Sequence, residues 1–367
     1  MLQQYYLASM FAEKHYPEII SPEQLDAYLG RAWYRMGQTI FTTHFLCFGR
    51  NYYSALWIRL SLEGYAFRKS LRKVMRKNEN RFQTIVRRGY IDIEKEKLYQ
   101  YYKSSFNGLL APTLKDSLLD GEEFNIYNTY EVAVYDGGEL IALSYFDLGL
   151  ESAASIMGIY HPAYSNYSLG IYTMLKEVEF AMEANLKYFY PGYVVPGYPR
   201  FDYKLRIGAV DYYQLSSASW QPYANLKPED IPIYAMEKHL LGMQQYLSHH
   251  NFKSSKLYYP LFEAGLFGFW NAPYFDYPCF LLCSPRHNTN QFLILAYNPE
   301  GNVYELIQCS LFDDLQFYFN ESYTQTFDTH HNFVRLIIKE KKLFTSQKPE
   351  QILAAIRQLQ EPGGAKS

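Results

Sequence analysis

A basic segment between Arg68 and Arg88 is the first part of this sequence whose residue types and spacing could do chemistry. It holds nine arginines or lysines and one acid, a net charge of +8, whereas the rest of the chain carries −10. Four of the basic residues are spaced to share one broad helix face: Arg72, Lys73, Arg76 and Lys77. Such a face suits a nucleic-acid phosphate backbone, which it would position without reading sequence. The alternative is a solvated face that binds nothing.

The segment from Tyr164 to Gly170 is a second candidate, because it precedes a predicted helix. Backbone N–H groups at a helix start can hold a pyrophosphate. The usual acetyl-CoA pattern is Gln/Arg-x-x-Gly-x-Gly/Ala, but Ser165 and Ser168 replace its first two fixed positions and only Gly170 fits. The segment is therefore a poor pyrophosphate site. It could instead hold a carbonyl oxygen, or simply cap the helix through Ser168.

A tyrosine-rich segment runs from Tyr188 to Lys204 and holds five tyrosines, three prolines and two glycines. This composition predicts a strand that bulges into a loop at the rim of an amphipathic pocket. Packing of the tyrosines in a core is the competing interpretation. The residues that we assign to the pocket from this segment, its basic end and the preceding helix start are Ser168, Gly170, Tyr190, Gly192, Tyr193, Arg200 and Arg206.

The sequence predicts no metal site. The four cysteines, Cys47, Cys279, Cys283 and Cys309, are too few for a disulfide scaffold in a chain of 367 residues. Cys279 and Cys283 lie on a strand-like run without a second pair nearby, so we expect both to be buried packing residues. The adjacent pairs His249-His250 and His330-His331 point in different directions and would chelate poorly.

The elements that must position these residues are clearest in the middle of the chain. The pattern predicts a hairpin, a third strand, a helix capped by Ser168 and a fourth strand, over Tyr130–Tyr135, Glu139–Asp147, Ala153–Tyr160, Leu169–Ala184 and Lys187–Val195. Three meandering strands, a crossover helix and a parallel strand form the middle of the acetyltransferase-type fold. In that fold the helix start and the adjoining strand ends form the binding site.

The flanking segments predict a larger organisation. Strand Tyr53–Leu62 and helices near Ser21-Pro22, Leu71–Phe82 and Ile93–Lys103 precede the middle segment. Helices over Pro232–Leu247 and Pro349–Leu359 enclose three predicted strands after it. We therefore expect an α/β (α+β) protein with an acetyltransferase-like mixed sheet. Its predicted divisions are an N-terminal α/β domain with the basic helix (1–105), a catalytic domain (106–225) and a C-terminal α/β extension (226–367).

Composition and hydropathy exclude two classes of protein. With 48% hydrophobic and 20% charged residues, the chain is not wholly disordered. No apolar run reaches the length of a membrane span, and the segment from Met1 to Glu13 lacks the basic start of a secretory signal. We expect a cytoplasmic protein without a membrane partner.

Taken in order, these motifs resemble the arginyl-tRNA–protein transferases, including their bacterial leucyl-transferring relatives. The resemblance covers roughly residues 30 to 222. Its first stretch is Ser70–Asn78, which is similar to the family's Ser-x-Arg-Arg-Val-x-x-Arg-Asn, followed by Leu98-Tyr99-x-x-Tyr102. Its second stretch consists of Ser168-Leu169-Gly170-x-Tyr172, Glu177-Val178-Glu179, Tyr188-x-Tyr190-Pro191-Gly192-Tyr193 and Phe201-Asp202-Tyr203-Lys204.

The resemblance implies transfer of an amino acid, arginine or similar, from charged tRNA to the N-terminal amine of a protein, as in N-end-rule tagging. Arg72–Lys77 would hold the tRNA, and no cofactor is needed. The implied catalytic residues are Asp202 as base, Tyr203, and Lys204, with Lys204 or the backbone near Gly170 stabilising the oxyanion. Family targets begin with acidic residues, which Arg200, Lys204 and Arg206 could pair with.

The sequence departs from the family at one point, and two other functions remain as alternatives. The family carries a cysteine cluster in its N-terminal region, of which only Cys47 is present here. This departure agrees with a protein without metal and puts its substrate choice in question. The first alternative is an acyl-CoA-dependent N-acyltransferase of the same fold, which would take acetyl-CoA. The second is a non-catalytic descendant that binds tRNA or peptide.

Overall fold

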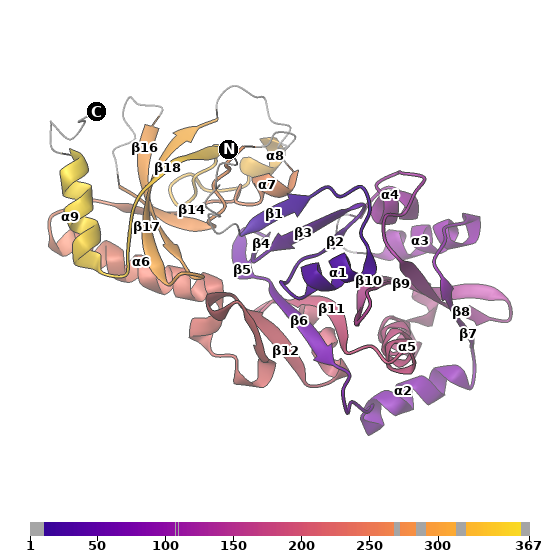
Figure 1. Ribbon diagram of the computed structural model, residues 1–367. Helices are drawn as coiled ribbons and strands as arrows, with labels where there is room; N and C mark the ends of the chain where they lie inside the picture. The colour runs from indigo at the N-terminus through magenta and orange to yellow at the C-terminus, as the bar shows by residue number, and fades with distance from the viewer. Residues whose placement is uncertain are drawn as a thin grey trace.

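The computed structural model describes residues 11–106, 108, 110–267, 272–283, 291–312 and 321–360. An eight-stranded mixed sheet and a five-stranded antiparallel sheet dominate this part of the chain, and they lie on opposite sides of Figure 1. The predicted α/β class is confirmed. The start of the chain, on which the expectation about a secretory signal rests, lies mostly outside the described residues.

The eight-stranded sheet has the order β13-β12-β6-β11-β10-β9-β8-β7. All neighbours in it are antiparallel except β10 and β11. The sheet takes β6 and β7 from the predicted N-terminal domain, so it crosses the predicted division at residue 105. Its strands are β6 (Leu56–Ser61), β7 (Gln83–Arg88), β8 (Thr129–Asp136), β9 (Glu139–Leu148), β10 (Ser152–Tyr160), β11 (Tyr188–Val194), β12 (Val210–Gln214) and β13 (Ser219–Pro222).

Helix α5 (Leu169–Glu183) is the crossover between β10 and β11, as the sequence predicts. It packs on the sheet through a fully buried apolar face that includes Leu175, Val178 and Ala181. The prediction that Ser168 caps this helix with its side chain is wrong. Ser168 has φ 56° and ψ 42° and makes no capping hydrogen bond, because this left-handed backbone differs from the extended one that lets a cap side chain reach the first amides.

The N-terminal part holds two small sheets. Strands β1 (Ala12–His15), β3 (Thr39–Thr43) and β2 (Tyr34–Met36) form one, and β4 (Phe45–Phe48) and β5 (Asn51–Ser54) form the other. The predicted single strand Tyr53–Leu62 is therefore two strands. The chain turns between them at Ala55, whose N–H bonds to the carbonyl of His44 at 3.0 Å, and so leaves the hairpin for the central sheet.

Four helices accompany these strands. Helix α1 (Pro22–Leu29) begins with the predicted Ser21 cap, which forms a reciprocal capping box with Gln24. The basic helix α2 (Lys69–Glu79) and α3 (Ile93–Ser105) also lie where the sequence predicts them, whereas α4 (Leu114–Leu119) was not predicted. The short 3-10 helices are η1 (Pro162–Tyr167), η2 (Pro199–Ile207), η3 (Leu215–Ser217), η4 (Tyr223–Asn225) and η5 (Pro228–Asp230).

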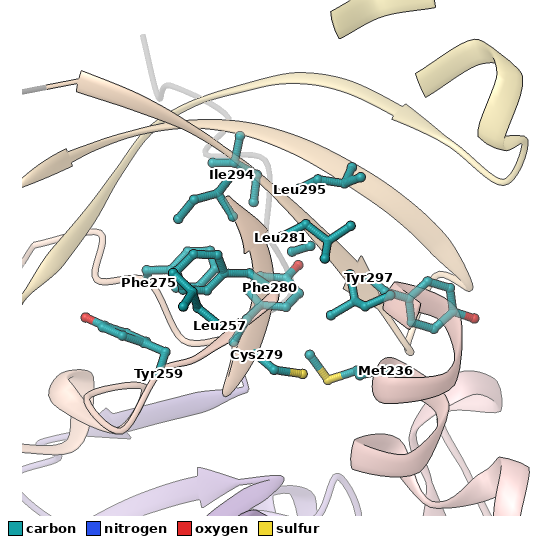
Figure 2. Close-up of a cluster of buried hydrophobic side chains, with 14 of the residues drawn as sticks. Met236, Leu257, Tyr259, Phe275, Cys279, Phe280, Leu281, Ile294, Leu295 and Tyr297 are labelled. Carbon is teal, nitrogen blue, oxygen red and sulfur yellow. The ribbon is translucent and has the colours of Figure 1, made fainter. Parts of the chain in front are cut away.

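The C-terminal sheet has the order β14-β15-β16-β17-β18 and is covered by α6 (Pro232–His249) and α9 (Pro349–Gln360) (Figure 1). Figure 2 shows its core, in which Met236 of α6 meets Cys279 and Phe280. Cys279 and Cys283 are buried there, which confirms their predicted packing role. The other elements are β14 (Ser255–Tyr258), β15 (Cys279–Leu282), β16 (Gln291–Asn298), β17 (Val303–Leu311), β18 (Ile337–Ser346), α7 (Ala264–Phe267) and α8 (Glu321–Thr324).

The C-terminal sheet is joined to the N-terminal strands by specific contacts. The N–H of Ile233 donates to Ser54 Oγ at 2.9 Å, and the rings of Tyr52 and Tyr258 stack at 4.9 Å. The C-terminal extension therefore packs against the β4–β5 hairpin. Among the described helices, none combines the length and the apolar character needed to cross a bilayer.

Candidate active site

The parallel strands β10 and β11 separate after a short paired stretch. They are paired from Ser152–Tyr188 to Ala154–Tyr190 and not beyond. Each strand also has an irregularity at this point: β10 shifts register against β9 after Ser155, and β11 shifts against β6 before Gly192. Pro191 lies at the irregularity of β11 and has no N–H to donate to the sheet. The irregularities therefore direct the two strands apart and open the sheet at their carboxyl ends.

A cavity of about 630 Å³ occupies this opening. Its size is that of a small-molecule site. Ser155 to Tyr160 of β10, Pro191 to Tyr193 of β11, the start of α5 and η2 form its walls. Aromatic residues from the N-terminal elements line it as well: Tyr34, Phe41, Trp57, Tyr102 and Phe106.

The start of α5 faces the cavity. Ser168, Leu169 and Gly170 line it, and the first amides of a helix have no partner within the helix. These amides can therefore donate hydrogen bonds to a carbonyl oxygen or to an anionic group. Gly170 is not needed for space, because an added Cβ would meet only the ring of Tyr160 at 3.7 Å.

Lys204 is a cationic group on the cavity wall. Its ammonium donates to the carbonyl of Tyr193 at 3.1 Å, and burial lowers the pKa of Lys204 to about 8. Gly192 lies directly against it: φ is +98°, and an added Cβ would lie 2.8 Å from Lys204 Nζ. Glycine at this position therefore supplies both the left-handed backbone and the room for the ammonium.

The structure brings most, but not all, of the predicted pocket residues together. Those that line the cavity are Ser168, Gly170, Gly192, Tyr193, Arg200, Tyr203, Lys204 and Arg206. The Tyr190 side chain is buried elsewhere, against the ring of Trp220 at 5.6 Å. Asp202 is exposed and lies outside the cavity lining. Burial raises the pKa of Tyr203 to about 12, so its hydroxyl stays protonated at neutral pH.

Sequence reasoning assigned no role to Glu177, which also lines the cavity. Its side chain is fully buried on α5, and neither carboxylate oxygen has a hydrogen-bond partner in the described part of the chain. Burial raises the pKa of Glu177 to about 8. A signal was present in the sequence, because Glu177 lies three residues after Met174 and four before Ala181, on the apolar stripe of the helix.

The predicted basic face of α2 lies beside the cavity mouth. Leu71 and Met75 bury the inner side of the helix, and the predicted basic residues are exposed on its outer side. Lys77 Nζ donates to the carbonyl of Asn166 at 2.8 Å. Because Asn166 belongs to η1, which leads directly into the start of α5, the basic helix is fixed to the segment that forms the mouth.

The described residues contain no group of three or more His, Cys, Asp and Glu that could hold a metal. Cys47 lies on β4 and is partly buried. Burial raises the pKa of Cys47 to about 11, so its thiol stays protonated at neutral pH. The prediction of a protein without a metal or cofactor stays a prediction.

An opened parallel strand pair in a mixed sheet, with a crossover helix starting at the opening, defines an acetyltransferase-like fold. Residues 80–214 match the family model described as the C terminus of arginine-tRNA–protein transferase. The family resemblance is confirmed: this part of the chain is similar to the C-terminal part of the arginyl-tRNA–protein transferases.

Curated relatives and solved structures complete this comparison. An aspartate/glutamate leucyltransferase from Leptospira interrogans is 27% identical over 194 residues, 52% of this chain and 74% of that protein. One from Campylobacter jejuni is 28% identical over 198 residues, 52% and 80% of the two chains. Among solved structures, a C-terminal DUF2156 domain from Agrobacterium fabrum has a TM-score of 0.31 at 11% identity, over 38% of this chain and 46% of that one.

Proposed function

We propose that this protein transfers an amino acid from an aminoacyl-tRNA to the N-terminal amine of a protein. The observation that carries the proposal is the cavity between β10 and β11, with Lys204 on its wall and the basic helix α2 at its mouth. The cavity has room for an aminoacyl ester, and α2 offers cations to the tRNA phosphates. The family match and the names of the curated relatives support the same reaction.

In the proposed reaction, the neutral amine of the acceptor attacks the ester carbonyl, forming an amide bond. The carbon–oxygen bond to the tRNA ribose breaks, and the proton that the amine gives up ends on the released ribose hydroxyl. An α-amine has a pKa near 8, so a part of it is already neutral at physiological pH. We assign stabilisation of the developing oxyanion to the Lys204 ammonium and the first amides of α5. Asp202 is a poor candidate for accepting this proton, because it is exposed and lies outside the cavity.

The acceptor and the donor amino acid are finer parts of the proposal. Arg200 and Arg206 line the cavity and would pair with an acidic first residue of the acceptor. The curated relatives are named for leucyl transfer to aspartate and glutamate, whereas the family model is named for arginine. We therefore propose leucine or arginine as the donor amino acid. The reaction would take place in the cytoplasm, where charged tRNA is found, and would tag its acceptors for degradation.

Removing the exposed charges of α2 should weaken tRNA binding. In a variant carrying Arg72→Ala, Lys73→Ala and Arg76→Ala, we expect the affinity for tRNA to fall about tenfold or more. The slope of log affinity against log salt should become shallower by about two to three, because each neutralised phosphate contributes about 0.7 to 0.9 to that slope. Filter binding across a salt series measures both.

The matched control for the α2 variant removes three exposed lysines of the C-terminal part, Lys238, Lys253 and Lys341. It carries the same change in net charge and should bind tRNA as the wild type does. Equal salt slopes in the α2 variant and the wild type would contradict the assignment of this helix to tRNA.

Gly192→Ala should reduce transfer by displacing the Lys204 ammonium. The added Cβ would lie 2.8 Å from Nζ, at a φ of +98°. Gly197→Ala is the control, since its φ is +83° and its Cβ would meet only Tyr234 and Tyr53 outside the cavity. Chemical unfolding should show a loss of about 1–3 kcal/mol in both variants. Only Gly192→Ala should also lower kcat for transfer. Equal transfer rates in the two variants would show that Gly192 has no role in the reaction.

The proposal is tested by offering the protein two classes of donor in parallel. Transfer of radiolabel from leucyl- or arginyl-tRNA to a peptide with an aspartate at its N-terminus is the expected result. Transfer from radiolabelled acetyl-CoA, with none from any charged tRNA, would establish the acyl-CoA alternative. Binding of tRNA without transfer from either donor would indicate the non-catalytic alternative.

A further inference from the structure

The floor of the cavity is polar although it lies deep in the protein. Glu177 and Thr173 of α5 and Ser144 of β9 line it, and each is at most 1% exposed. Ser155 of β10 completes this group. Both carboxylate oxygens of Glu177 and the hydroxyl of Ser144 lack a hydrogen-bond partner among the described residues. A buried polar group without a partner is unfavourable, so these three atoms on the wall of one cavity form a place where a polar ligand group can bind.

No described cation satisfies the Glu177 carboxylate. Arg35 also lines the cavity, but its guanidinium is paired with Asp147 at 2.9 Å. Lys204 donates to a backbone carbonyl, and it is not among the groups that shift the pKa of Glu177. The hydroxyls of Ser144 and Ser155 lie close enough to lower that pKa against the larger effect of burial, but a hydroxyl brings no positive charge to the carboxylate.

The other walls of the cavity also suit a cation. The rings of Tyr34, Phe41, Trp57 and Tyr193 line it, and aromatic faces attract positive charge in a site with little water. The rings of Tyr34 and Trp57 stack at 5.1 Å, and Tyr193 packs edge-on against Trp57 at 5.2 Å. These contacts fix an aromatic wall in the same cavity as the carboxylate.

We propose that Glu177 is the recognition site for a positively charged nitrogen of the donor amino acid. An aminoacyl ester always carries one such group, its α-ammonium, and an arginyl ester carries a second, its guanidinium. Either one would donate N–H groups to the two carboxylate oxygens and to Ser144 Oγ. The proposal rests on the proposed function for the identity of the ligand, and on the buried, unpaired carboxyl group of Glu177 for the place where the cation binds.

Glu177→Gln is the variant that tests this proposal, because it removes the charge and keeps the shape. We expect kcat/KM for the aminoacyl-tRNA donor to fall about 10- to 100-fold, the range for loss of charge-assisted hydrogen bonds. Affinity for uncharged tRNA should not change. Glu183→Gln is the matched control: it is the same substitution on the same helix, at an exposed position outside the cavity lining and away from the basic face of α2. It should leave kcat/KM unchanged.

Two donors distinguish the two sources of positive charge. An equal loss with leucyl- and arginyl-tRNA assigns Glu177 to the α-ammonium, whereas a loss with arginyl-tRNA alone assigns it to the guanidinium. Values of kcat/KM within twofold of the wild type for both donors would overturn the proposal.

A binding measurement keeps this test independent of catalysis and of the variant's folding. The probes are non-hydrolysable amides that join leucine or arginine to the 3′ position of adenosine, compared with analogues that lack the α-amino group or the guanidinium. The wild type should bind at least one amide about tenfold or more tightly than its analogue lacking the cation. Equal affinities throughout would overturn the recognition proposal, whereas the absence of transfer from charged tRNA would overturn only the proposed function.

Discussion

Replacing Lys204 by methionine is expected to lower kcat for aminoacyl transfer about 100-fold. Removing one donor to a developing oxyanion has an effect of this size in other acyl-transfer sites. Methionine is one atom shorter than lysine, but its unbranched apolar side chain suits the neighbouring rings of Tyr193 and Phe201, whose centroids lie 5.2 and 5.5 Å from Lys204 Nζ. Single-turnover transfer with saturating donor measures the effect. Lys187→Met, at an exposed lysine before β11, is the control and should transfer at the wild-type rate.

The pH dependence of this effect tests the role of Lys204. Burial lowers its pKa to about 8, so the ammonium is present below pH 8 and is lost as the pH rises through that value. The ratio of wild-type to Lys204→Met rates cancels the ionisation of the acceptor amine. If Lys204 stabilises the oxyanion, this ratio falls above pH 8. A ratio that rises through pH 8 would instead indicate that neutral Lys204 accepts a proton.

The largest effect on stability is expected from Arg35→Met. The guanidinium of Arg35 pairs with Asp147 at 2.9 Å, and the two side chains are 1% and 0% exposed. Arg35 also donates to the carbonyl of Leu118 on α4 at 2.5 Å. Removing one partner of a buried ion pair leaves an uncompensated charge, which typically lowers the free energy of unfolding by about 3–5 kcal/mol. Urea unfolding measures this loss.

Two further variants test whether the loss of stability comes from the buried ion pair of Arg35 and Asp147. Arg31→Met removes an exposed guanidinium four residues earlier and should change stability by less than about 0.5 kcal/mol. Adding Asp147→Leu to Arg35→Met removes the unpaired carboxylate and should recover much of the loss. A loss below about 1 kcal/mol in Arg35→Met alone would show that the pair does not stabilise the fold in this way.

The middle of the fold could be predicted because its local signals agree with its tertiary structure. The alternation in β8 and β9 flanks the Asp136-Gly137-Gly138 turn, and the apolar stripe of α5 follows β10 directly. By contrast, β7 carries Arg87 and Arg88 and is only partly buried, so it lacks the alternation of a half-buried strand. It becomes a strand by pairing with β8 at the sheet edge.

The candidate site was predictable only where its residues are close together in sequence. The segments around Gly170 and Gly192 could be identified by composition and resemblance. The fit of Gly192 against Lys204 depends on how η2 folds back over β11, which no local pattern encodes. Tyr190 and Asp202 each adjoin a cavity residue in sequence. The backbone nevertheless directs the Tyr190 side chain into a core and leaves Asp202 exposed to solvent. Glu177 was missed although it lies in a resemblance motif and on an apolar stripe, because neither signal shows that its carboxyl group borders a cavity.

The most direct test of the account is the intact mass of an acceptor peptide after incubation with this protein and charged tRNA. A peptide beginning with aspartate should gain the mass of one leucyl or one arginyl residue, and fragmentation should place that residue at the N-terminus. The same peptide with an acetylated N-terminus should not change. An unmodified aspartate peptide with every charged tRNA, or an added residue on a side-chain amine instead of the N-terminus, would contradict the account.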